Sequence, residues 1–440
     1  MKHTLTLLIA LLLAPVAALL AADEKPANAA GTVDVGVGIM DITPTEEVTL
    51  AGSPSPKRTS EVKTRLYVRA LVLSAGGKKI AIVTLDTLKY PVEQVQKARA
   101  KIEQTTGIPA SDVIICASHT HFGPLWSYYK DQLATPISEA VAQAVRDLTP
   151  CTVGVAKGKA DGLSECRRVI KDGHAWNRWQ LKPDEADKYP AEGPYDAEFN
   201  VLAFTGKQGK LKAVVYNYAC HATSTRAPFI SADYPGEVAL QVEKQLGFDV
   251  PIFFLTGACG DVNPVVSLRH DFIGEKLGTE IVRCLGQLEP IAKPTISMEA
   301  REFAMPGREH PEFKEAEITR NWPSQLEHYR KAFDEMKKRE KPTYPYFVSG
   351  ICIGDDFAIV TNADEIFCSI GLSIKQHSPF KHTMVAEQTN GAHGYVPTAK
   401  AFGNGSYETW FGEHSYLSTK AGEIIERVSL DTLNHLKHEN

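Results

Sequence analysis

Residues 114–124 read IICASHTHFGP, and this stretch decides how the surrounding sequence is interpreted. The apolar run at 112–117 predicts a short buried strand, and the Gly-Pro pair after the histidines predicts that the strand stops there. His119 and His121 are two residues apart, so in extended backbone their side chains point to the same face. Both imidazoles can then reach one centre just beyond the strand, where open α/β sheets hold their ligands. A polar loop with two solvated histidines is the alternative.

The segments on either side of this stretch alternate between strand-like and helix-like patterns. The alternation predicts an α/β fold with a substantially parallel sheet, and the glycine pair at 76–77 predicts a hairpin that makes the sheet mixed. We therefore expect a mixed, substantially parallel β-sheet core flanked by helices, in a single large catalytic domain spanning 33–440. The expected strands are 33–44, 65–73, 79–85, 112–117, 199–205, 211–218, 251–256, 295–303, 346–353, 356–361 and 382–387, and the expected helices are 92–104, 136–148, one ending near 245, 272–288, 365–375 and 419–436.

The composition is ordinary for a globular protein, with 43% hydrophobic and 23% charged residues. A net charge of −5 gives no reason to expect a nucleic-acid partner. The sequence contains eight cysteines but no C-x-x-C pair, and several of the cysteines lie in apolar, strand-like contexts. An exported chain permits disulfides, but we interpret most of these cysteines as small buried hydrophobic residues.

The N-terminus has the pattern of an export signal. A short polar start precedes the almost wholly apolar run Leu5–Ala22, and small residues suited to cleavage follow it. We predict a signal peptide at 1–22 and a flexible leader at 23–32, so the mature protein is expected to be exported, either periplasmic or secreted. The run is also about long enough to span a bilayer, which leaves an uncleaved anchor as the alternative.

Residues 158–198 are polar with scattered aromatic side chains and little periodicity. Loops of this length inside a compact domain are usually functional or disordered. The aromatic residues Trp176, Trp179, Tyr189 and Tyr195 favour an ordered cover near a site.

Other potential metal ligands follow further predicted strands. His221 comes just after the strand 211–218, and Asp364, Glu365, His393 and Tyr395 lie in 361–395. Zinc takes nitrogen and oxygen ligands, and its catalytic sites keep one position open for water. Ligands placed at separate strand ends fit that plan, although no H-E-x-x-H signature is present.

Five segments, in order, resemble those of the neutral/alkaline non-lysosomal ceramidase family. Residues 35–44 are similar to its opening Gly-x-Gly-x-x-Asp-Ile-Thr, and 118–121 to its Thr/Ser-His-Thr-His. Residues 221–224 resemble its His-Pro-Thr-Ser, 260–264 its Gly-Asp-Val-Ser-Pro, and 394–398 its Tyr-Val-Thr-Thr. The resemblance extends from about residue 33 to the end of the chain.

The resemblance implies a Zn²⁺ held by His119, His221, Glu365 and Tyr395, with His121 facing the substrate. Asp364 competes with Glu365, because the family usually shows Pro-Gly-Glu where this chain has Ala-Asp-Glu. The resemblance also implies a substrate-contacting arginine, either Arg167 or Arg168. In that scheme His121 stabilises the oxyanion or protonates the leaving amine. Asp233 and Asp261 are candidates for orienting the histidines, or else serve as a helix N-cap and a turn residue.

The implied function is that of an exported zinc-dependent hydrolase that cleaves the amide of an N-acyl sphingoid base or related N-acyl lipid. A lipid substrate is compatible with association at a membrane surface. Two departures weaken the link to ceramide. Asn263 stands where the family has serine, and the chain lacks the carboxyl-terminal domain of full-length ceramidases. The alternatives are a hydrolase of the same fold that acts on another amide or ester, and a non-catalytic binding homologue.

Overall fold

The computed structural model describes residues 31–53, 56–130 and 132–439. The predicted signal peptide, and all but the last two residues of the predicted leader, lie outside the described residues. No helix in the described part of the chain is both long enough and apolar enough to cross a membrane.

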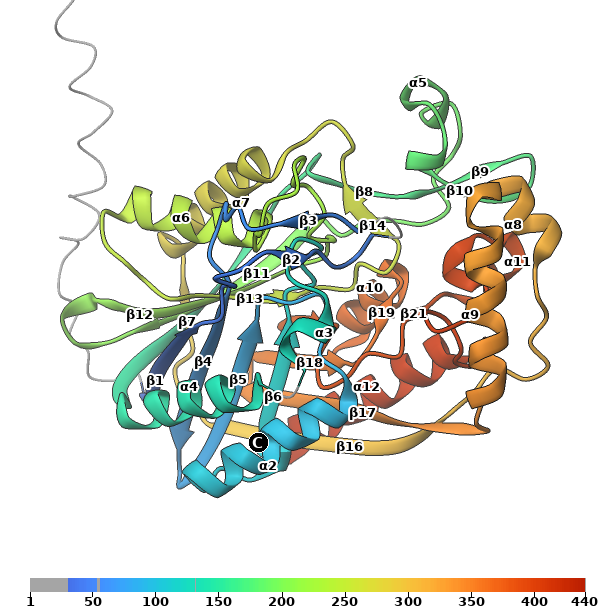
Figure 1. The fold of residues 1–440 in the computed structure, drawn as a ribbon. Coiled ribbons are helices and arrows are strands. Elements are labelled where there is room, and N and C mark those ends of the chain that lie inside the picture. The colour runs from blue at the N-terminus through green and yellow to red at the C-terminus, as the bar shows by residue number, and fades with distance from the viewer. Residues whose placement is uncertain (1–30, 54–55, 131, 440) are drawn as a thin grey trace, which may run out of the picture.

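The largest element is a nine-stranded mixed sheet (Figure 1). Short hairpins connect β4 to β5 and β11 to β12, and tight hairpins force antiparallel pairing. From one edge to the other the order is β13 (Ile252–Thr256), β12 (Leu211–Tyr218), β11 (Glu198–Thr205), β7 (Thr149–Lys159), β1 (Val33–Asp41), β4 (Tyr67–Ala75), β5 (Lys78–Leu85) and β6 (Val113–Ala117), and β15 (Glu289–Pro290) pairs with β7.

This sheet curls so far that its two edge strands come together. β6 and β13 stand at opposite ends of the strand order, yet the Thr256 hydroxyl donates to the Ala117 carbonyl at 2.8 Å. Beyond the strands, Thr120 and Ala222 form a further backbone bridge. The curl therefore brings the ends of β6 and β12 next to each other.

A second sheet, of four strands, packs against the first. Its order is β16 (Ile296–Pro306), β17 (Thr343–Ile353), β18 (Phe357–Asn362) and β20 (His382–Ala386). One hydrophobic core contains residues of both sheets, including Leu71, Val215, Ile351 and Met384. The alternation of side chains along each strand explains the layering. Within β4, for example, Leu71 faces the other sheet whereas Val72 faces the helices.

Helices cover the outer faces of both sheets. On the large sheet lie α2 (Val92–Thr106), α4 (Ala134–Arg146), α6 (Tyr234–Leu246) and α7 (His270–Leu285), and on the small sheet lie α10 (Cys368–His377) and α12 (Ala421–Glu439). Gly36 and Gly38 of β1 allow α4 to approach closely, because a Cβ at either position would come within 1.9 Å of a carbonyl oxygen of α4. The glycines at the start of the family motif thus serve packing.

Shorter elements surround one end of the sheets. They are β2 (Val48–Thr49), β3 (Arg58–Thr59), α3 (Trp126–Tyr129), β8 (Ser164–Cys166), β9 (Arg168–Lys171), β10 (His174–Asn177), α5 (Pro183–Ala186), β14 (Val262–Pro264), α8 (Glu315–Asn321), α9 (Leu326–Arg339), β19 (Glu365–Ile366), β21 (Tyr395–Val396) and α11 (Ala399–Asn404). The 158–198 segment is therefore ordered, as expected.

The mixed α/β fold with flanking helices is confirmed, with three differences. Within the two main sheets, parallel pairing among the described strands is limited to β5–β6, β12–β13 and β18–β20, which is less than a substantially parallel sheet implies. The strand β7 and the helices α8 and α9 are not among the expected elements. The helix expected from Glu365 begins only at Cys368, because Glu365 and Ile366 pair with β21 instead. The assignment of 33–440 to one catalytic domain stays a prediction.

All eight cysteines are buried and free, which agrees with their interpretation as small hydrophobic residues. Burial raises the pKa of the Cys116 thiol to about 11, so this side chain stays protonated at neutral pH.

Candidate metal centre

Three histidines meet where the curled sheet closes. His119 follows β6, and His221 follows β12. One ring nitrogen from each of His119, His121 and His221 lies within 4.8 Å of those of the other two. The His119 ring centroid is 5.0 Å from that of His121 and 4.7 Å from that of His221. The expectation that both histidines of the 114–124 stretch reach one centre agrees with this arrangement.

Backbone carbonyls orient all three rings. The Nδ1 atoms of His119, His221 and His121 lie 2.8, 3.0 and 2.9 Å from the carbonyl oxygens of Leu88, Val262 and Gly52, respectively. A carbonyl can only accept, so each Nδ1 carries the proton, and each neutral ring presents a lone pair at Nε2. The Nε2 atoms of His119 and His121 are buried, and neither has a hydrogen-bond partner among the described residues. These are the tautomers that metal ligands need.

Gly52 is required for the orientation of His121. Its φ of +77° lies in the left-handed region, and a Cβ there would come within 2.2 Å of the His121 Nδ1 atom.

Glu365 faces the same point as the histidine lone pairs. Its Oε2 atom lies 3.4 Å from the Nε2 of His119 and 3.2 Å from the Nε2 of His221. Two ligand atoms each ~2.1 Å from a tetrahedral zinc are about 3.4 Å apart, so this spacing is that of two ligands sharing an ion. The carboxylate and the lone pairs are all acceptors, and a cation among them would satisfy all three.

Asp364, the competitor of Glu365, points elsewhere. Its carboxylate accepts hydrogen bonds from the backbone N–H of His393 and from the His393 ring at 3.0 Å. This buried pair joins the segments that carry Glu365 and Tyr395. The structure thus brings Glu365, and not Asp364, to the histidines.

Tyr395 lies beside Glu365, since the two residues are register partners in the parallel pair β19–β21. Its hydroxyl is 3.2 Å from that of Tyr407, and its ring lies under the Arg167 guanidinium at 5.2 Å. Burial, followed by the nearby Glu365 carboxylate, raises the pKa of Tyr395 well above its usual value.

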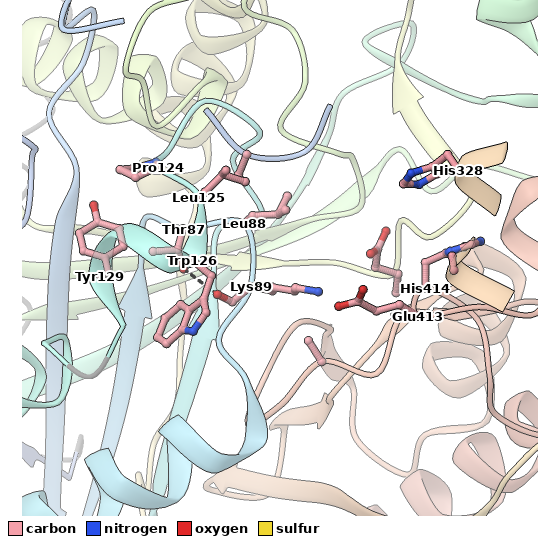
Figure 2. Close-up of a pocket in the computed structure, with 15 residues that line it drawn as sticks. Thr87, Leu88, Lys89, Pro124, Leu125, Trp126, Tyr129, His328, Glu413 and His414 are labelled. Atoms are coloured by element: carbon pink, nitrogen blue, oxygen red, sulfur yellow. Dashed lines mark hydrogen bonds between the residues drawn. The ribbon is translucent and has the colours of Figure 1, made fainter. Parts of the chain in front are cut away.

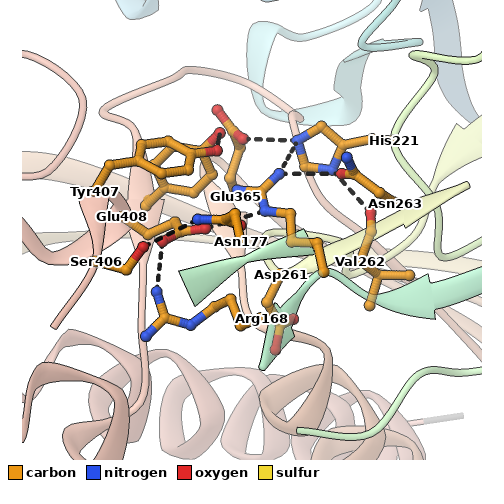
Figure 3. Close-up of polar contacts among 12 residues, drawn as sticks. Arg168, Asn177, His221, Asp261, Val262, Asn263, Glu365, Ser406, Tyr407 and Glu408 are labelled. Carbon is orange, nitrogen blue, oxygen red and sulfur yellow. Dashed lines mark hydrogen bonds and ion pairs between the residues drawn. The ribbon is translucent and has the colours of Figure 1, made fainter. Parts of the chain in front are cut away.

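The neighbouring arginines Arg167 and Arg168 have different surroundings, and Figure 3 shows Arg168 bonded to Glu408. Arg167 Nη1 donates to His221 Nε2 and to Asn263 Oδ1, both at 3.2 Å, and its buried Nη2 has no hydrogen-bond partner among the described residues. Arg168 is fully engaged with Glu192, Glu408 and the Gly405 carbonyl. Arg167 is therefore the arginine of the site, and Arg168 supports the surrounding loops.

The surroundings keep the His221 and His121 rings neutral and the Glu365 carboxylate charged. Burial, together with Arg167, lowers the pKa of His221 to about 4. Burial also lowers the pKa of His121 well below its usual value. For Glu365, burial alone would raise the pKa, but His119 and His221 outweigh burial and lower it well below the usual range.

A pocket of about 360 Å³ opens beside this centre, with Glu365 in its wall. Figure 2 shows Trp126 and Tyr129 on one side of the pocket and His328, His414 and Glu413 on the other. His328 belongs to α9, one of the helices that the sequence does not predict. Trp126 lines the pocket, whereas none of the four aromatic residues of 158–198 does. Trp179 instead lies over the Arg167 guanidinium at 5.4 Å.

Comparison with known proteins identifies the family of the chain. Residues 33–268, more than half of the sequence, match the model of the family described as neutral/alkaline non-lysosomal ceramidase, N-terminal. The chain belongs to this family. No curated protein matches the sequence.

Two solved structures share the fold of this ceramidase-family chain. One, described as a ceramidase complexed with C2, has a TM-score of 0.73 and 17% identity, and the match covers 93% of this chain and 76% of that one. The other, a neutral ceramidase from Pseudomonas aeruginosa, has a TM-score of 0.72 and 18% identity, with 93% and 75% covered. The resemblance to the family is thereby confirmed, and four of the five segments lie within the matched residues; the family supports a ceramidase-type amidohydrolase.

Asp233 and Asp261 do not contact the histidine rings of this ceramidase-family site. The Asp233 carboxylate accepts four hydrogen bonds from Ser224 and Thr225, so it holds the turn after His221 and makes no side-chain cap on α6. The Asp261 carboxylate accepts from the first N–H of α10 at 2.7 Å, and its backbone carbonyl accepts from Arg167 N–H at 2.8 Å. Neither residue orients a ring directly; the backbone carbonyls do so.

Sequence reasoning missed Tyr407 and Glu408. Tyr407 contacts Tyr395, and the buried Glu408 bonds both Arg167 and Arg168. Their only signal is the Gly- and aromatic-rich composition of the loop that ends at His414. Asn263, noted only as a departure from the family, turns out to hold Arg167.

Proposed function

We propose that the protein is an exported zinc-dependent hydrolase that cleaves the amide of an N-acyl lipid to a fatty acid and an amine. The observation that carries the proposal is the meeting of the His119 and His221 lone pairs with the Glu365 carboxylate at ligand-to-ligand spacing. Export rests on the predicted signal peptide alone.

The donor set suits zinc. His119, His221 and Glu365 would hold the ion, with Tyr395 beside Glu365 as the fourth protein ligand. His121 belongs to the three-histidine cluster and competes with Glu365 for the third position. We favour Glu365, because its Oε2 atom lies 3.4 Å from the His119 Nε2 and 3.2 Å from the His221 Nε2, which is the spacing of two ligands on one tetrahedral ion. Zinc, when bound, supplies a Lewis acid that activates water and polarises a carbonyl.

His121 and Arg167 would each perform one further step of the reaction. The His121 Nδ1–H is committed to the Gly52 carbonyl, so the neutral ring offers only an acceptor at Nε2. His121 therefore suits proton transfer from the attacking water to the leaving nitrogen. The free N–H groups of the buried Arg167 Nη2 suit the developing oxyanion.

The first pocket supports an acyl group as part of the substrate. Its wall beside Glu365 includes Leu88, Leu125, Trp126 and Tyr129, and sites for lipid-like ligands are mostly apolar with a few polar anchors. An N-acyl sphingoid base is one compound of this class. A substrate of this kind is compatible with activity at a membrane surface.

Two measurements on protein never exposed to a chelator test the proposal: elemental analysis and hydrolysis of a fluorogenic N-acyl sphingosine. We expect about one zinc per chain and release of fatty acid. Zinc with activity only on other acyl compounds would indicate the hydrolase of another amide or ester. Absence of both zinc and hydrolysis would contradict the proposal and indicate a binding homologue.

A further inference from the structure

A second pocket, of about 260 Å³, has His121 in its wall. It is formed by the 50–53 segment, by Lys57 and Phe122, and by the turn 223–228 that follows His221. Neither the family motifs nor the proposed chemistry gives this pocket a role.

The two pockets meet at the metal centre. Ala51 lines both, and the next residue, Gly52, holds the His121 ring. Glu365 lines the first pocket and His121 the second, while His119 contacts both side chains. A substrate whose amide lies at the centre can therefore extend one half into each pocket.

The two pockets differ in charge. Glu365, Glu413 and Lys89 line the first, so both signs are present there. In the second, the charged residues are Lys57 and Arg226, and no described acidic residue lines it. Arg226 donates to the carbonyls of Val266 and Leu268. Neither cation forms an ion pair within the described ranges.

We propose that the second pocket binds a carboxylate on the amine half of the substrate, which makes N-acyl amino acids the preferred class. This inference rests on the proposed amide hydrolysis. Water adds its oxygen to the acyl carbon, the C–N bond breaks, and the amine nitrogen takes the proton, so the products are a fatty acid and an amino acid. The apolar first pocket holds the acyl chain, and two unpaired cations offer the carboxylate its partners.

Two amides that differ at one group test this assignment: N-lauroylglycine, which has a carboxylate, and N-lauroylethanolamine, which has a hydroxyl. We expect kcat/KM to favour N-lauroylglycine by about tenfold, which two partly exposed ion pairs can supply together. The preference should shrink in 0.5 M NaCl, because salt screens exposed charges. A merely structural role of the two cations would produce no such salt dependence.

Variants of the two cations test whether they cause the preference for N-lauroylglycine. Lys57→Met and Arg226→Gln should each reduce the preference about threefold, and Lys57→Glu should reverse it. Arg226→Gln keeps an N–H donor for the carbonyls that Arg226 holds. Lys244→Met removes an exposed lysine on α6, outside either pocket, and should leave the preference unchanged.

Equal kcat/KM for the two amides, or a preference that survives both substitutions, would overturn the inference and leave the proposed function intact. If neither amide is hydrolysed by zinc-loaded protein, the proposed function fails. In that case the equilibrium Kd of each compound for the same preparation decides the inference. Tighter binding of N-lauroylglycine that is lost in Lys57→Met supports it, and equal Kd values overturn it.

Discussion

The candidate metal centre has two halves that are built differently. The histidine half comes from the ends of β6 and β12, strands of the large sheet that are buried along their length. The other half consists of Glu365, Tyr395, Arg167 and Tyr407, which come from short strands and loops. The backbone carbonyls of Leu88, Val262 and Gly52 fix the histidine rings, whereas the loop half depends on buried ion pairs such as Asp364–His393 and Arg167–Glu408.

This difference implies two kinds of mutational sensitivity. Substitutions in the histidine half should change metal binding or chemistry without unfolding the protein, because the apolar strands remain. In the loop half, substitutions of residues at the centre should reduce metal binding or activity. Substitutions of residues that only support the loops should reduce stability.

The largest effect is expected within the histidine half. His119→Ala should lose zinc and activity together, because it removes one of few ligands. His121→Ala should keep zinc and lose ~10²–10⁴-fold in rate, about 3–5 kcal/mol of transition-state stabilisation. Zinc content and initial rate are measured on the same preparations. Loss of zinc in His121→Ala with retention in His119→Ala would show that the ligand assignment is reversed.

The next comparison lies within the loop half, between two adjacent carboxylates. Glu365→Gln should weaken zinc binding and reduce the rate by ~10² or more, because amides are poor zinc ligands. Asp364→Asn should mainly lower the free energy of unfolding, by about 2 kcal/mol, since it weakens the hydrogen bonds to the buried His393. Zinc titration and urea unfolding of both variants measure the two effects. The opposite pattern would make Asp364 the ligand.

A pH experiment probes Asp261, which supports α10 and the Arg167 backbone. Burial raises the pKa of this carboxyl to about 6 in the folded state. The folded protein then binds the proton more tightly than the unfolded chain, so the stability that this group contributes is lost as pH rises through about 6. Asp261→Asn, which cannot ionise, should gain about 2 kcal/mol relative to wild type between pH 4 and pH 7.

Urea midpoints at the two pH values measure this difference. Asp184→Asn, at an exposed position of α5, is the matched control. A constant difference for Asp261→Asn would mean that Asp261 keeps an ordinary pKa.

The smallest effect concerns the wall of the first pocket. Trp126→Ala should raise KM for long-chain amides about tenfold and KM for short-chain amides much less, because only a long chain reaches the apolar wall. Initial rates over a series of acyl lengths test this. An equal rise at every length would return Trp126 to a packing role.

The histidine half was largely predictable from sequence. The runs 112–117 and 211–218 are continuous apolar segments, and a histidine just after each one marks a strand end. What the sequence could not reveal is that these strand ends meet, because the meeting depends on the curl of the whole sheet. Curl is a property of many strand pairs together and leaves no local pattern.

The loop half was less predictable. Two pairs of adjacent residues had to be told apart: Glu365 from Asp364, and Arg167 from Arg168. The distinction depends on which side chain faces the centre. In irregular backbone, no periodic pattern in the sequence predicts the direction of a side chain. The family resemblance pointed to this neighbourhood, and in the structure Glu365 and Arg167 lie at the histidines. Tyr407 and Glu408 lie in a loop with no motif at all, so only packing could identify them.

The curl of the large sheet also has a consequence for folding. An exposed strand edge is a template for aggregation. In this sheet the edge strand β6 exchanges backbone hydrogen bonds with residues 388–390, and the Thr256 hydroxyl of the other edge strand, β13, donates to the Ala117 carbonyl of β6. During refolding, both edges stay open until the sheet has closed on itself. The yield of refolded protein should therefore fall steeply as the protein concentration rises. An ion bound by ligands at the ends of both β6 and β12 would stabilise the closed sheet.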